Sequence, residues 1–357
     1  MNDQVMKALR YLGPGRTELL DVPRPMPREG EVLLRVGAAG ICHSDVHVAR
    51  GTSSLTQLND LAPFTLGHEI AGVVVTTGSN VAASLRGMRA AVYAPTGCLA
   101  CASCSEGAWN YCDARDEDSV AGLGLGQDGG LAQYVAVDAQ RLVDIGDLPF
   151  ESAAVSTDAA LTSIHAISMI PPSDPSVSTI VVIGVGGLGH LAVQILAHLG
   201  YQVIAVDNRE SVRPVAIDSG AQVFCSPEEL MDVVVKQAGV RGATSVLDFV
   251  GSTQTLDLAE RVLGTRGSLV LVGSAGGQVV VDKSRTEVRR GVSYHVPVWG
   301  TLPELGNVIA LARQGVLRPV VTQTSLERAA EALDALHKGD VAGRLVVTDF
   351  GDVGSDS

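Results

Sequence analysis

The chain has few basic residues, and this excludes one large class of partners. Its 357 residues contain 26 lysines and arginines against 39 aspartates and glutamates, so the formal net charge is -13. Proteins that bind nucleic acid need a basic surface to face the phosphate backbone. We therefore expect no nucleic-acid partner, and the acidic balance by itself identifies no substrate.

Cysteine is also scarce, and it is unevenly placed. Six cysteines are too few for a disulfide scaffold in a chain of this length, yet four of them are crowded between positions 98 and 112. In a protein without an export signal, such crowding favours a metal site over disulfides. The N-terminal residues MNDQVMKALRYLG lack the basic region and apolar run of a signal peptide, so we expect a cytoplasmic protein.

An unbroken apolar run is missing as well. Residues 179–206 carry no charged side chain, but glycines cluster inside this stretch, at positions 184, 186, 187 and 189. A helix that spans a membrane would not place a glycine cluster there. We expect no membrane partner and interpret the stretch as strand, turn and helix.

Two kinds of sequence pattern divide the chain. The first 150 residues contain short β-rich runs such as EVLLRVGAAG and IAGVVVTTGS, separated by glycine and proline. From about residue 156, strand and helix patterns alternate, which predicts a doubly wound parallel sheet. We predict that residues 156–296 form one domain and that residues 1–155 and 297–357 together form another.

The segment GVGGLG predicts a dinucleotide site because of its surroundings. It follows a strand and opens a helix, and Asp207 ends the next strand. The three motif glycines permit, in order, a tight turn, close approach of the backbone to a pyrophosphate, and packing of the helix on the strand. The Asp207 carboxylate would bind ribose hydroxyls and repel a 2′-phosphate, which favours NAD over NADP, although Arg209 lies nearby. The predicted cofactor-binding residues here are Gly184, Gly186, Gly187, Leu188, Gly189, Asp207 and Arg209.

A second motif, GCLACASCSEGAWNYC, predicts a structural metal site. Four thiolates at this spacing can close a tetrahedron around Zn²⁺ and leave no position for water. An iron–sulfur cluster uses similar spacing, but nothing else in the chain implies an electron-transfer partner. The predicted ligands are Cys98, Cys101, Cys104 and Cys112.

The segment GICHSDVH, residues 40–47, is open to three interpretations. It could be a polar turn, a redox site at Cys42, or part of a metal site that other residues complete. A catalytic zinc needs three protein ligands and an open position. The segment LGHE offers His68 beside Glu69, and STDAALTS places Asp158 at the start of a helix. Spacing alone does not select Asp158.

Taken together, the motifs resemble those of the medium-chain, zinc-dependent alcohol dehydrogenases. GICHSDVH, GHE, the four-cysteine segment, GVGGLG with Asp207, and VAGRLVV occur in the family's order and cover nearly the whole chain. The resemblance implies a Rossmann doubly wound parallel sheet plus a β-rich GroES-like catalytic domain with a structural zinc lobe. It also implies NAD, one catalytic and one structural zinc per chain, a small alcohol or ketone substrate, and a homo-oligomer, with a tetramer favoured over a dimer.

The resemblance assigns roles in the catalytic zinc site. Cys42 and His68 match zinc ligands, and Asp158 stands where many members have cysteine. Glu69 matches a residue that lies against the zinc, and Asp45 matches a carboxylate that orients the ligand histidine. Because a carboxylate donates less charge than a thiolate, we expect a stronger Lewis acid and a more easily lost ion.

The resemblance also assigns proton, coenzyme and substrate contacts. Ser44 matches the hydroxyl that takes the substrate proton, and His47 matches the solvent end of that relay, although His47 is also open to a plain surface role. Further matches are His43 and Arg344 near the pyrophosphate, Thr162 against the nicotinamide, and Trp299 beside the substrate. The histidines at positions 165, 190, 198 and 295 are interpreted as structural or solvent-facing.

The substrate is less visible than the chemistry. An aspartate ligand together with Trp299 is similar to bacterial enzymes that act on secondary alcohols and on aryl or alkyl ketones. The loop ARGTSSLTQLNDLAP has no lysine or arginine after Arg50, which disfavours anionic substrates. The alternative within the family is a primary or aryl-alcohol dehydrogenase. The intact ligand set disfavours a nucleotide sensor without catalysis, and the acidic charge disfavours a nucleic-acid-binding zinc module.

Overall fold

The computed structural model describes residues 5–53, 56–115, 121–280, 282, 290–339, 341 and 343–352. The chain forms two compact units. The β-rich unit comprises Met1–Asp158, Thr301–Gln314 and Val321–Ser357, and the α/β unit comprises Ala159–Gly300 and Gly315–Val320. The domain boundaries expected after residues 155 and 296 stay a prediction.

The β-rich unit is built around one large sheet. Within the described part of the chain this sheet has seven strands, in the order β10-β6-β5-β3-β18-β17, with β9 also paired to β3. Strand β3 is buried along most of its length, as its nearly continuous apolar sequence predicts. The strands are β3 (Glu31–Ile41), β5 (Glu69–Thr77), β6 (Arg89–Val92), β9 (Tyr134–Asp138), β10 (Leu142–Asp144), β17 (Val321–Ser325) and β18 (Arg344–Asp349).

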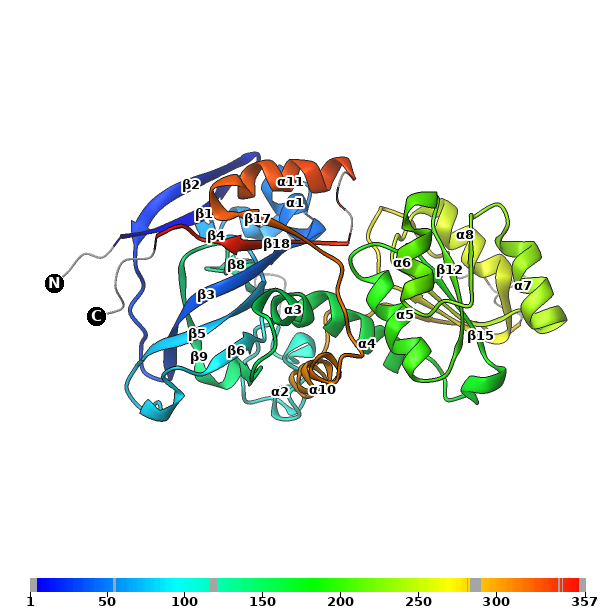
Figure 1. Ribbon diagram of the computed structural model, residues 1–357, viewed down its shortest axis with the longest axis horizontal. Helices are drawn as coiled ribbons and strands as arrows, with labels where there is room; N and C mark the ends of the chain where they lie inside the picture. The colour runs from blue at the N-terminus through cyan, green and yellow to red at the C-terminus, as the bar shows by residue number, and fades with distance from the viewer. Residues whose placement is uncertain are drawn as a thin grey trace. The chain divides into compact units, whose positions relative to one another are not determined.

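Smaller strands and five α-helices, besides shorter helical turns, complete this unit among the described residues (Figure 1). Helix α3 packs on β3, because Gly37 leaves room for the Phe150 ring: a Cβ at Gly37 would lie 2.6 Å from Phe150 Cδ2. The smaller strands are β1 (Val5–Gly13), β2 (Arg16–Pro23), β4 (Phe64–Thr65), β7 (Gly122–Leu123) and β8 (Gly126–Gln127). The helices are α1 (His43–Arg50), α2 (Ala102–Ser105), α3 (Phe150–Val155), α10 (Leu302–Arg313) and α11 (Ala329–Lys338).

The α/β unit confirms the predicted doubly wound sheet. Its six strands, counted over the described residues, are all parallel and lie in the order β13-β12-β11-β14-β15-β16. Read in chain order this is 3-2-1-4-5-6, the order of the Rossmann fold. The strands are β11 (Thr179–Ile183), β12 (Gln202–Val206), β13 (Val223–Cys225), β14 (Ala243–Asp248), β15 (Leu263–Leu271) and β16 (Ser293–His295).

Helices surround this sheet (Figure 1) and bury their apolar faces against it. The uncharged stretch 179–206 is β11, a glycine turn, α5 and β12, as predicted. Among the described residues, none of the helices has the length and apolar character that a bilayer span requires. The helices are α4 (Leu161–Ser168), α5 (Gly189–His198), α6 (Arg213–Asp218), α7 (Leu230–Ala238) and α8 (Thr253–Val262).

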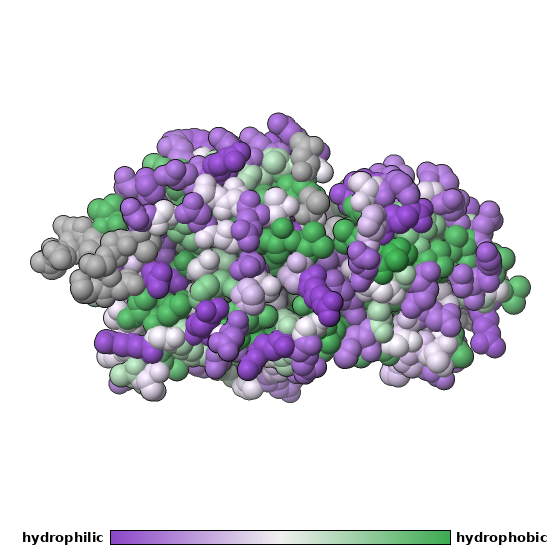
Figure 2. Space-filling view, in the orientation of Figure 1, coloured by the Kyte–Doolittle hydropathy of each residue, from purple (hydrophilic) through white to green (hydrophobic). Residues whose placement is uncertain are grey.

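The outer surface is mixed in character. Figure 2 shows hydrophilic residues over much of the visible face, with smaller apolar areas between them. The chemistry-bearing residues named above are mostly buried instead: His68, Glu69, Asp45 and Asp158 are each less than a tenth exposed. These candidate site residues therefore lie in the interior of the protein and not on its surface.

Candidate active site

The metal-site residues are held by the junction between strand β3 and helix α1. Cys42 is the N-cap of α1, and its backbone N–H donates to Asp45 Oδ2 at 2.8 Å. The other oxygen of Asp45 accepts from the Gly67 N–H at 3.1 Å and lies 3.4 Å from His68 Nδ1. Asp45 is fully buried, so one carboxylate both caps the helix and orients the His68 ring.

His68 and Glu69 come from the start of strand β5, which pairs with β3. Gly40 of β3 lies opposite Glu69 in this pairing. A Cβ at Gly40 would collide with the Glu69 carboxylate, so only glycine leaves room for that side chain. The glycine that opens the GICHSDVH segment is thus part of the site.

Asp158 lies in an unusual helical turn. The prediction that Asp158 stands at the start of a helix was wrong. The chain is already helical from Phe150, and Asp158 sits inside a π-helical turn, Ser156–Ala160, between α3 and α4. Such turns insert an extra residue into a helix and are frequently found at functional sites. Asp158 Oδ2 lies 3.7 Å from His68 Nε2.

Four potential metal ligands meet at this place. Sγ of Cys42, a ring nitrogen of His68 and carboxylate oxygens of Glu69 and Asp158 all lie within 4.8 Å of one another, and all four residues are buried. Sulfur, imidazole and carboxylate together are a donor set that Zn²⁺ accepts. The residues present therefore fit a zinc ion, which Cys42, His68 and Asp158 would hold with Glu69 beside it.

Arg344 of strand β18 joins the two carboxylates. Its Nη2 donates to Asp158 Oδ2 at 2.9 Å, and its Nε donates to Glu69 Oε2 at 3.1 Å. Nη2 is also ion-paired with Glu69 Oε1. The Arg344 side chain is 4% exposed, so this is a buried network. The expected pyrophosphate contact of Arg344 stays a prediction.

The electrostatics of this cluster favour ionised groups. Burial by itself would raise the pKa of the Cys42 thiol, but the charge of Arg344 and the hydrogen bond with His68 outweigh it, and the pKa is lowered. Burial by itself would lower the pKa of His68, but Asp45 and Asp158 raise it well above the ordinary value. The site thus concentrates negative charge around the position that a cation would take.

The remaining residues of the GICHSDVH segment lie on helix α1. Ser44 is exposed, and its hydroxyl lies 3.8 Å from Cys42 Sγ. His47, one turn further along, is half-buried, with Nδ1 at 3.3 Å from Thr52 Oγ1. His43 is exposed at the first position of the helix. The hydroxyl of Ser44 is therefore adjacent to a potential metal ligand.

The four cysteines of the second motif also come together. Their sulfur atoms lie within 4.8 Å of one another, and Sγ of Cys101 and Cys112 are 4.0 Å apart. Backbone N–H groups point at these sulfurs: Cys104 and Asp113 donate to Cys101 Sγ at 3.4 Å each, and Cys98 donates to Cys112 Sγ at 3.3 Å. N–H donors stabilise thiolates, so the lobe fits a structural zinc.

The glycine turn of the α/β unit has the shape that a dinucleotide needs. Gly184 has φ of +89°, and a Cβ there would lie 2.8 Å from Val250 Cγ2. A Cβ at Gly186 would meet no atom within 4 Å, whereas one at Gly189 would collide with the Gly184 carbonyl. The open space beside Gly186, at the start of helix α5, fits a pyrophosphate.

Asp207 ends β12 beside this turn and is paired with Arg209. Its Oδ2 accepts from the Val185 N–H at 2.9 Å and from Arg209 Nη2 at 3.0 Å, and its Oδ1 accepts from Arg209 Nε at 3.0 Å. Burial by itself would raise the pKa of Asp207, but the Arg209 hydrogen bonds outweigh it, and the pKa is lowered. The Asp207 carboxylate is therefore held in its ionised form, and its predicted contact with ribose hydroxyls stays a prediction.

The predicted nicotinamide and substrate contacts belong to the same unit. Thr162 is buried in helix α4, and Trp299 is half-buried with a positive φ of 52°. Bulky residues rarely adopt this backbone conformation, so the placement of Trp299 is a specific feature of the fold. Residues 54–55 of the loop expected to wall the substrate pocket lie outside the described residues.

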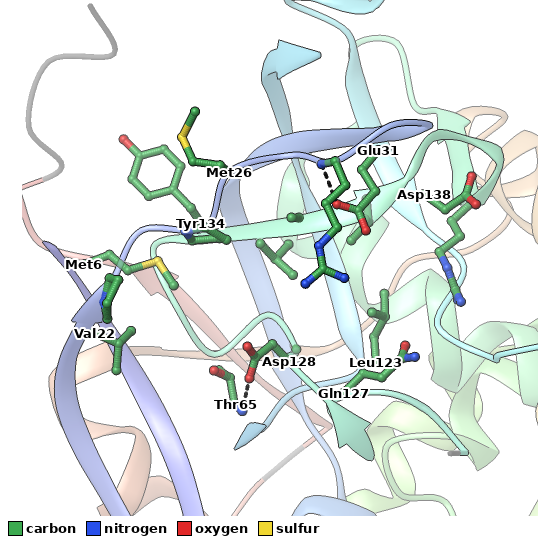
Figure 3. A pocket seen from close by; sticks show the side chains of 18 of the residues that line it. Met6, Val22, Met26, Glu31, Thr65, Leu123, Gln127, Asp128, Tyr134 and Asp138 are labelled. Atoms are coloured by element: carbon green, nitrogen blue, oxygen red, sulfur yellow. Dashed lines mark hydrogen bonds between the residues drawn. The ribbon is translucent and has the colours of Figure 1, made fainter. Parts of the chain in front are cut away.

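A separate pocket opens in the β-rich unit, and none of the potential metal ligands lines it. It has a volume of about 640 Å³ and includes Met6, Met26, Tyr134 and Asp128 in its wall (Figure 3). Its Arg10 is already paired with Asp128. Because it contains none of the predicted site residues, we assign the chemistry to the buried clusters instead.

Sequence reasoning missed the partners that hold the site together. It found Arg344 but not its two carboxylate partners, and it gave no role to Arg141. Nη1 of Arg141 donates to three carbonyl groups, those of Tyr93, Ala94 and Pro95, at 2.7–3.0 Å, beside the four-cysteine lobe. No signal in the local sequence announces contacts between residues so far apart.

Comparison with known proteins identifies both halves of the chain. Residues 28–147 match the family model for the alcohol dehydrogenase GroES-like domain, and residues 187–314 match the model for zinc-binding dehydrogenases. These matches cover the segments that hold Cys42, His68 and the four-cysteine lobe, and the second half of the glycine turn, residues 187–189. The GroES-like and Rossmann parts expected from the resemblance are thereby confirmed.

Individual relatives extend over nearly the whole chain. An NAD-dependent alcohol dehydrogenase of Sulfurisphaera tokodaii is 34% identical over 353 residues, which cover 96% of this chain and 99% of the relative. A D-arabinose 1-dehydrogenase (NADP(+)) of Saccharolobus solfataricus is 31% identical over 337 residues, covering 92% and 93%. The acetophenone reductase from Geotrichum candidum, solved with NAD, has a TM-score of 0.85 and 32% identity, with 98% of each chain covered.

Proposed function

The chain belongs to the medium-chain zinc-dependent alcohol dehydrogenases, and from this premise we propose that it interconverts apolar or aryl secondary alcohols and ketones, with Cys42, His68 and Asp158 holding the catalytic zinc. Its reaction is that of an NAD-dependent zinc alcohol dehydrogenase. The residue roles and the substrate class are the parts proposed here.

One observation carries the assignment of residues. Buried sulfur, imidazole and carboxylate donors converge within 4.8 Å, and the hydroxyl of Ser44 lies 3.8 Å from the Cys42 sulfur. A zinc site needs such donors, and alcohol oxidation needs a group beside the metal that takes the hydroxyl proton. The second zinc belongs to the four-cysteine lobe, where the donor set leaves no position for substrate.

When bound, the zinc supplies a Lewis acid that favours loss of the alcohol proton, and NAD supplies the hydride acceptor. The chain's own residues orient the potential zinc ligands and neutralise their charge. Asp45 holds the His68 ring through Nδ1, which fixes the nitrogen that faces the ligand cluster. Arg344 compensates the charge of Glu69 and Asp158.

Ser44 and His47 form the proposed proton path. The Ser44 hydroxyl would accept the proton of the alcohol, and His47 would release it to solvent at the other end of the path. Positions 44 and 47 lie one turn apart on α1 and so share a face of the helix. His47, being half-buried, can exchange the proton with solvent.

The coenzyme contacts are proposed on the glycine turn. The backbone N–H groups of the turn would hold the pyrophosphate, Asp207 the adenosine ribose, and Thr162 the nicotinamide. Arg209 would flank the adenosine, and His43 would be a further pyrophosphate contact. The proposed turn residues are Gly184, Gly186, Gly187, Leu188 and Gly189.

The substrate class rests on composition and on similarity. The wall loop has no basic residue after Arg50, and Trp299 supplies an aromatic face, which together suit an uncharged substrate. The similarity to an acetophenone reductase supports an aryl ketone as the reduced substrate. We further propose a cytoplasmic homotetramer; light scattering on purified protein tests the tetramer.

Two paired comparisons test the substrate class. NAD reduction is followed with 1-phenylethanol against benzyl alcohol, and with 2-butanol against 1-butanol, on protein whose zinc content has been measured. Faster turnover of both secondary alcohols is the expected result. Faster turnover of the primary alcohols would overturn the secondary-alcohol proposal and leave the primary-alcohol alternative of the same family.

A further inference from the structure

His190 is a fully buried titratable residue to which the mechanism above gives no role. It is the second residue of helix α5 and directly follows the last glycine of the turn. Burying an imidazole without hydrogen bonds is costly, so its two ring nitrogens need partners. Nδ1 lies 2.7 Å from the Gly186 carbonyl oxygen, and Nε2 lies 3.2 Å from the backbone nitrogen of Val320.

The two partners fix the tautomer of the ring. A backbone N–H can only donate, so Nε2 accepts from Val320 and carries no proton. Nδ1 therefore carries the proton and donates it to the Gly186 carbonyl. Burial lowers the pKa of His190, in keeping with a neutral ring. Both ring nitrogens therefore have a hydrogen-bond partner: Nδ1 is a donor and Nε2 is an acceptor.

The bond to Gly186 controls the turn on which the proposed function places the coenzyme. The C=O of Gly186 and the N–H of Gly187 belong to one planar trans peptide and point in opposite directions. When His190 holds the carbonyl, the N–H of Gly187 must point away from His190. The backbone bond from the His190 N–H to the same carbonyl is long, at 3.4 Å, so the side chain makes the shorter contact.

The same face of α5 also fixes a distant segment of the same unit. Gln194, four residues after His190, donates from Nε2 to the Arg318 carbonyl at 3.0 Å and accepts from the Arg318 N–H at 2.8 Å. His190 and Gln194 together hold residues 318–320 along the helix. Of these two residues, only His190 also contacts the glycine turn.

We propose that His190 is a positioning residue for the coenzyme: its Nδ1–H holds the Gly186 carbonyl and thereby aims the Gly187 N–H at the pyrophosphate. The proposal rests on the proposed coenzyme site at Gly184–Gly189. Loss of this hydrogen bond should therefore weaken the binding of NAD. Hydride transfer itself needs no contribution from this ring.

Two substitutions separate the two bonds of the ring. In His190→Asn the amide nitrogen takes the place of Nδ1, so the bond to Gly186 is kept and the bond from Val320 is lost. In His190→Gln the amide lies one atom farther out, so it can serve Val320 but not Gly186. The Kd of NAD, measured by calorimetry without alcohol, reads the effect independently of turnover.

We expect NAD affinity to fall about tenfold in His190→Gln, because the Gly187 N–H that donates to the charged pyrophosphate is then no longer held in its direction. His190→Asn should bind NAD within about threefold of the unaltered protein. The KM for NAD should follow the same order, with kcat at saturating NAD unchanged. Gln194→Leu is the matched control, because it releases Arg318 and leaves Gly186 alone.

Three results would overturn the proposal: unchanged affinity in His190→Gln, an equal loss in both variants, or a tenfold loss in His190→Asn. The last still decides the matter if His190→Gln does not fold. Gly186→Val fills the open space beside the turn and tests the coenzyme site itself. If it leaves NAD binding intact, the proposed site fails; if it abolishes binding while His190→Gln has no effect, only the role of His190 fails.

Discussion

Replacing Arg344 by methionine should destabilise the zinc-depleted protein far more than the zinc-loaded protein. Arg344 neutralises Glu69 and Asp158 at 3.1 and 2.9 Å, and the three side chains are 4%, 0% and 10% exposed. Methionine keeps most of the volume and removes the charge. Two buried carboxylates are then left without their cation.

The expected loss follows from this burial. Removing one partner of a buried ion pair costs about 3–5 kcal/mol, because the remaining charge is left desolvated. Each kcal/mol shifts the Tm of a domain of this size by about 2–4 °C, so the zinc-depleted variant should melt about 6–20 °C below the unaltered protein. A bound divalent cation replaces the lost charge, and zinc at a thousandfold its Kd adds about 4 kcal/mol.

The assay is thermal unfolding followed by circular dichroism, first with chelator and then after zinc is restored. Arg50→Met is the matched control: Arg50 pairs with Asp334 at 2.9 Å, but the side chains are 41% and 63% exposed, so the loss should be below about 1 kcal/mol. If zinc-depleted Arg344→Met melts no lower than Arg50→Met, the two carboxylates do not depend on Arg344 and the reasoning is refuted.

Three further predictions concern the proton path, the coenzyme and pH. Ser44→Ala should lower turnover about 10²–10⁴-fold while the measured zinc content stays the same; unchanged turnover removes Ser44 from the path. Arg209→Ala should lower kcat/KM with NADP relative to NAD about tenfold, because Arg209, once released from Asp207, is the cation that can face a 2′-phosphate; an unchanged ratio would exclude this role. Burial lowers the pKa of His190 in the folded state, so below about pH 6.5 the unfolded chain binds this proton more readily than the folded chain. The free energy of unfolding then falls by up to about 1.4 kcal/mol per pH unit as the pH is lowered. Above that pH His190 does not change the stability. The Tm of His190→Asn should therefore fall less than that of the unaltered protein between pH 7.5 and pH 5, whereas a variant of the exposed His337 should follow the unaltered protein.

Local sequence patterns predicted the α/β unit because its signals are local. The strand β11, the glycine turn and helix α5 follow one another within residues 179–198, and each is visible as a short pattern. The rules for alternating strands and helices then predict a doubly wound parallel sheet, and the structure adds the order of its six described strands. The four-cysteine lobe was predictable for the same reason, since its ligands lie within fifteen residues of one another.

Contacts across long sequence separations were not predictable in this way. Arg344 meets Asp158 and Glu69 across 186 and 275 residues, and His190 meets Val320 across 130. Each contact depends on how separate strands and helices pack, which no local pattern records. The π-helical turn was not predicted because the sequence around Asp158 shows an ordinary helical pattern, and no local pattern marks the inserted residue.

The charge balance of the site explains why Arg344 accompanies an aspartate at position 158. The Cys42 thiolate, Glu69 and Asp158 carry three negative charges in a buried place, and a divalent cation cancels two of them. Arg344 cancels the third, so the charges of these three ligand groups are balanced only when both cations are present. A thiolate at position 158 would offer a single acceptor atom, whereas a carboxylate has two oxygens. Asp158 can therefore accept a hydrogen bond from Arg344 and still turn an oxygen toward a metal ion. Because Arg344 draws on the same carboxylate, Asp158 and Arg344 together determine how little charge Asp158 donates to that ion.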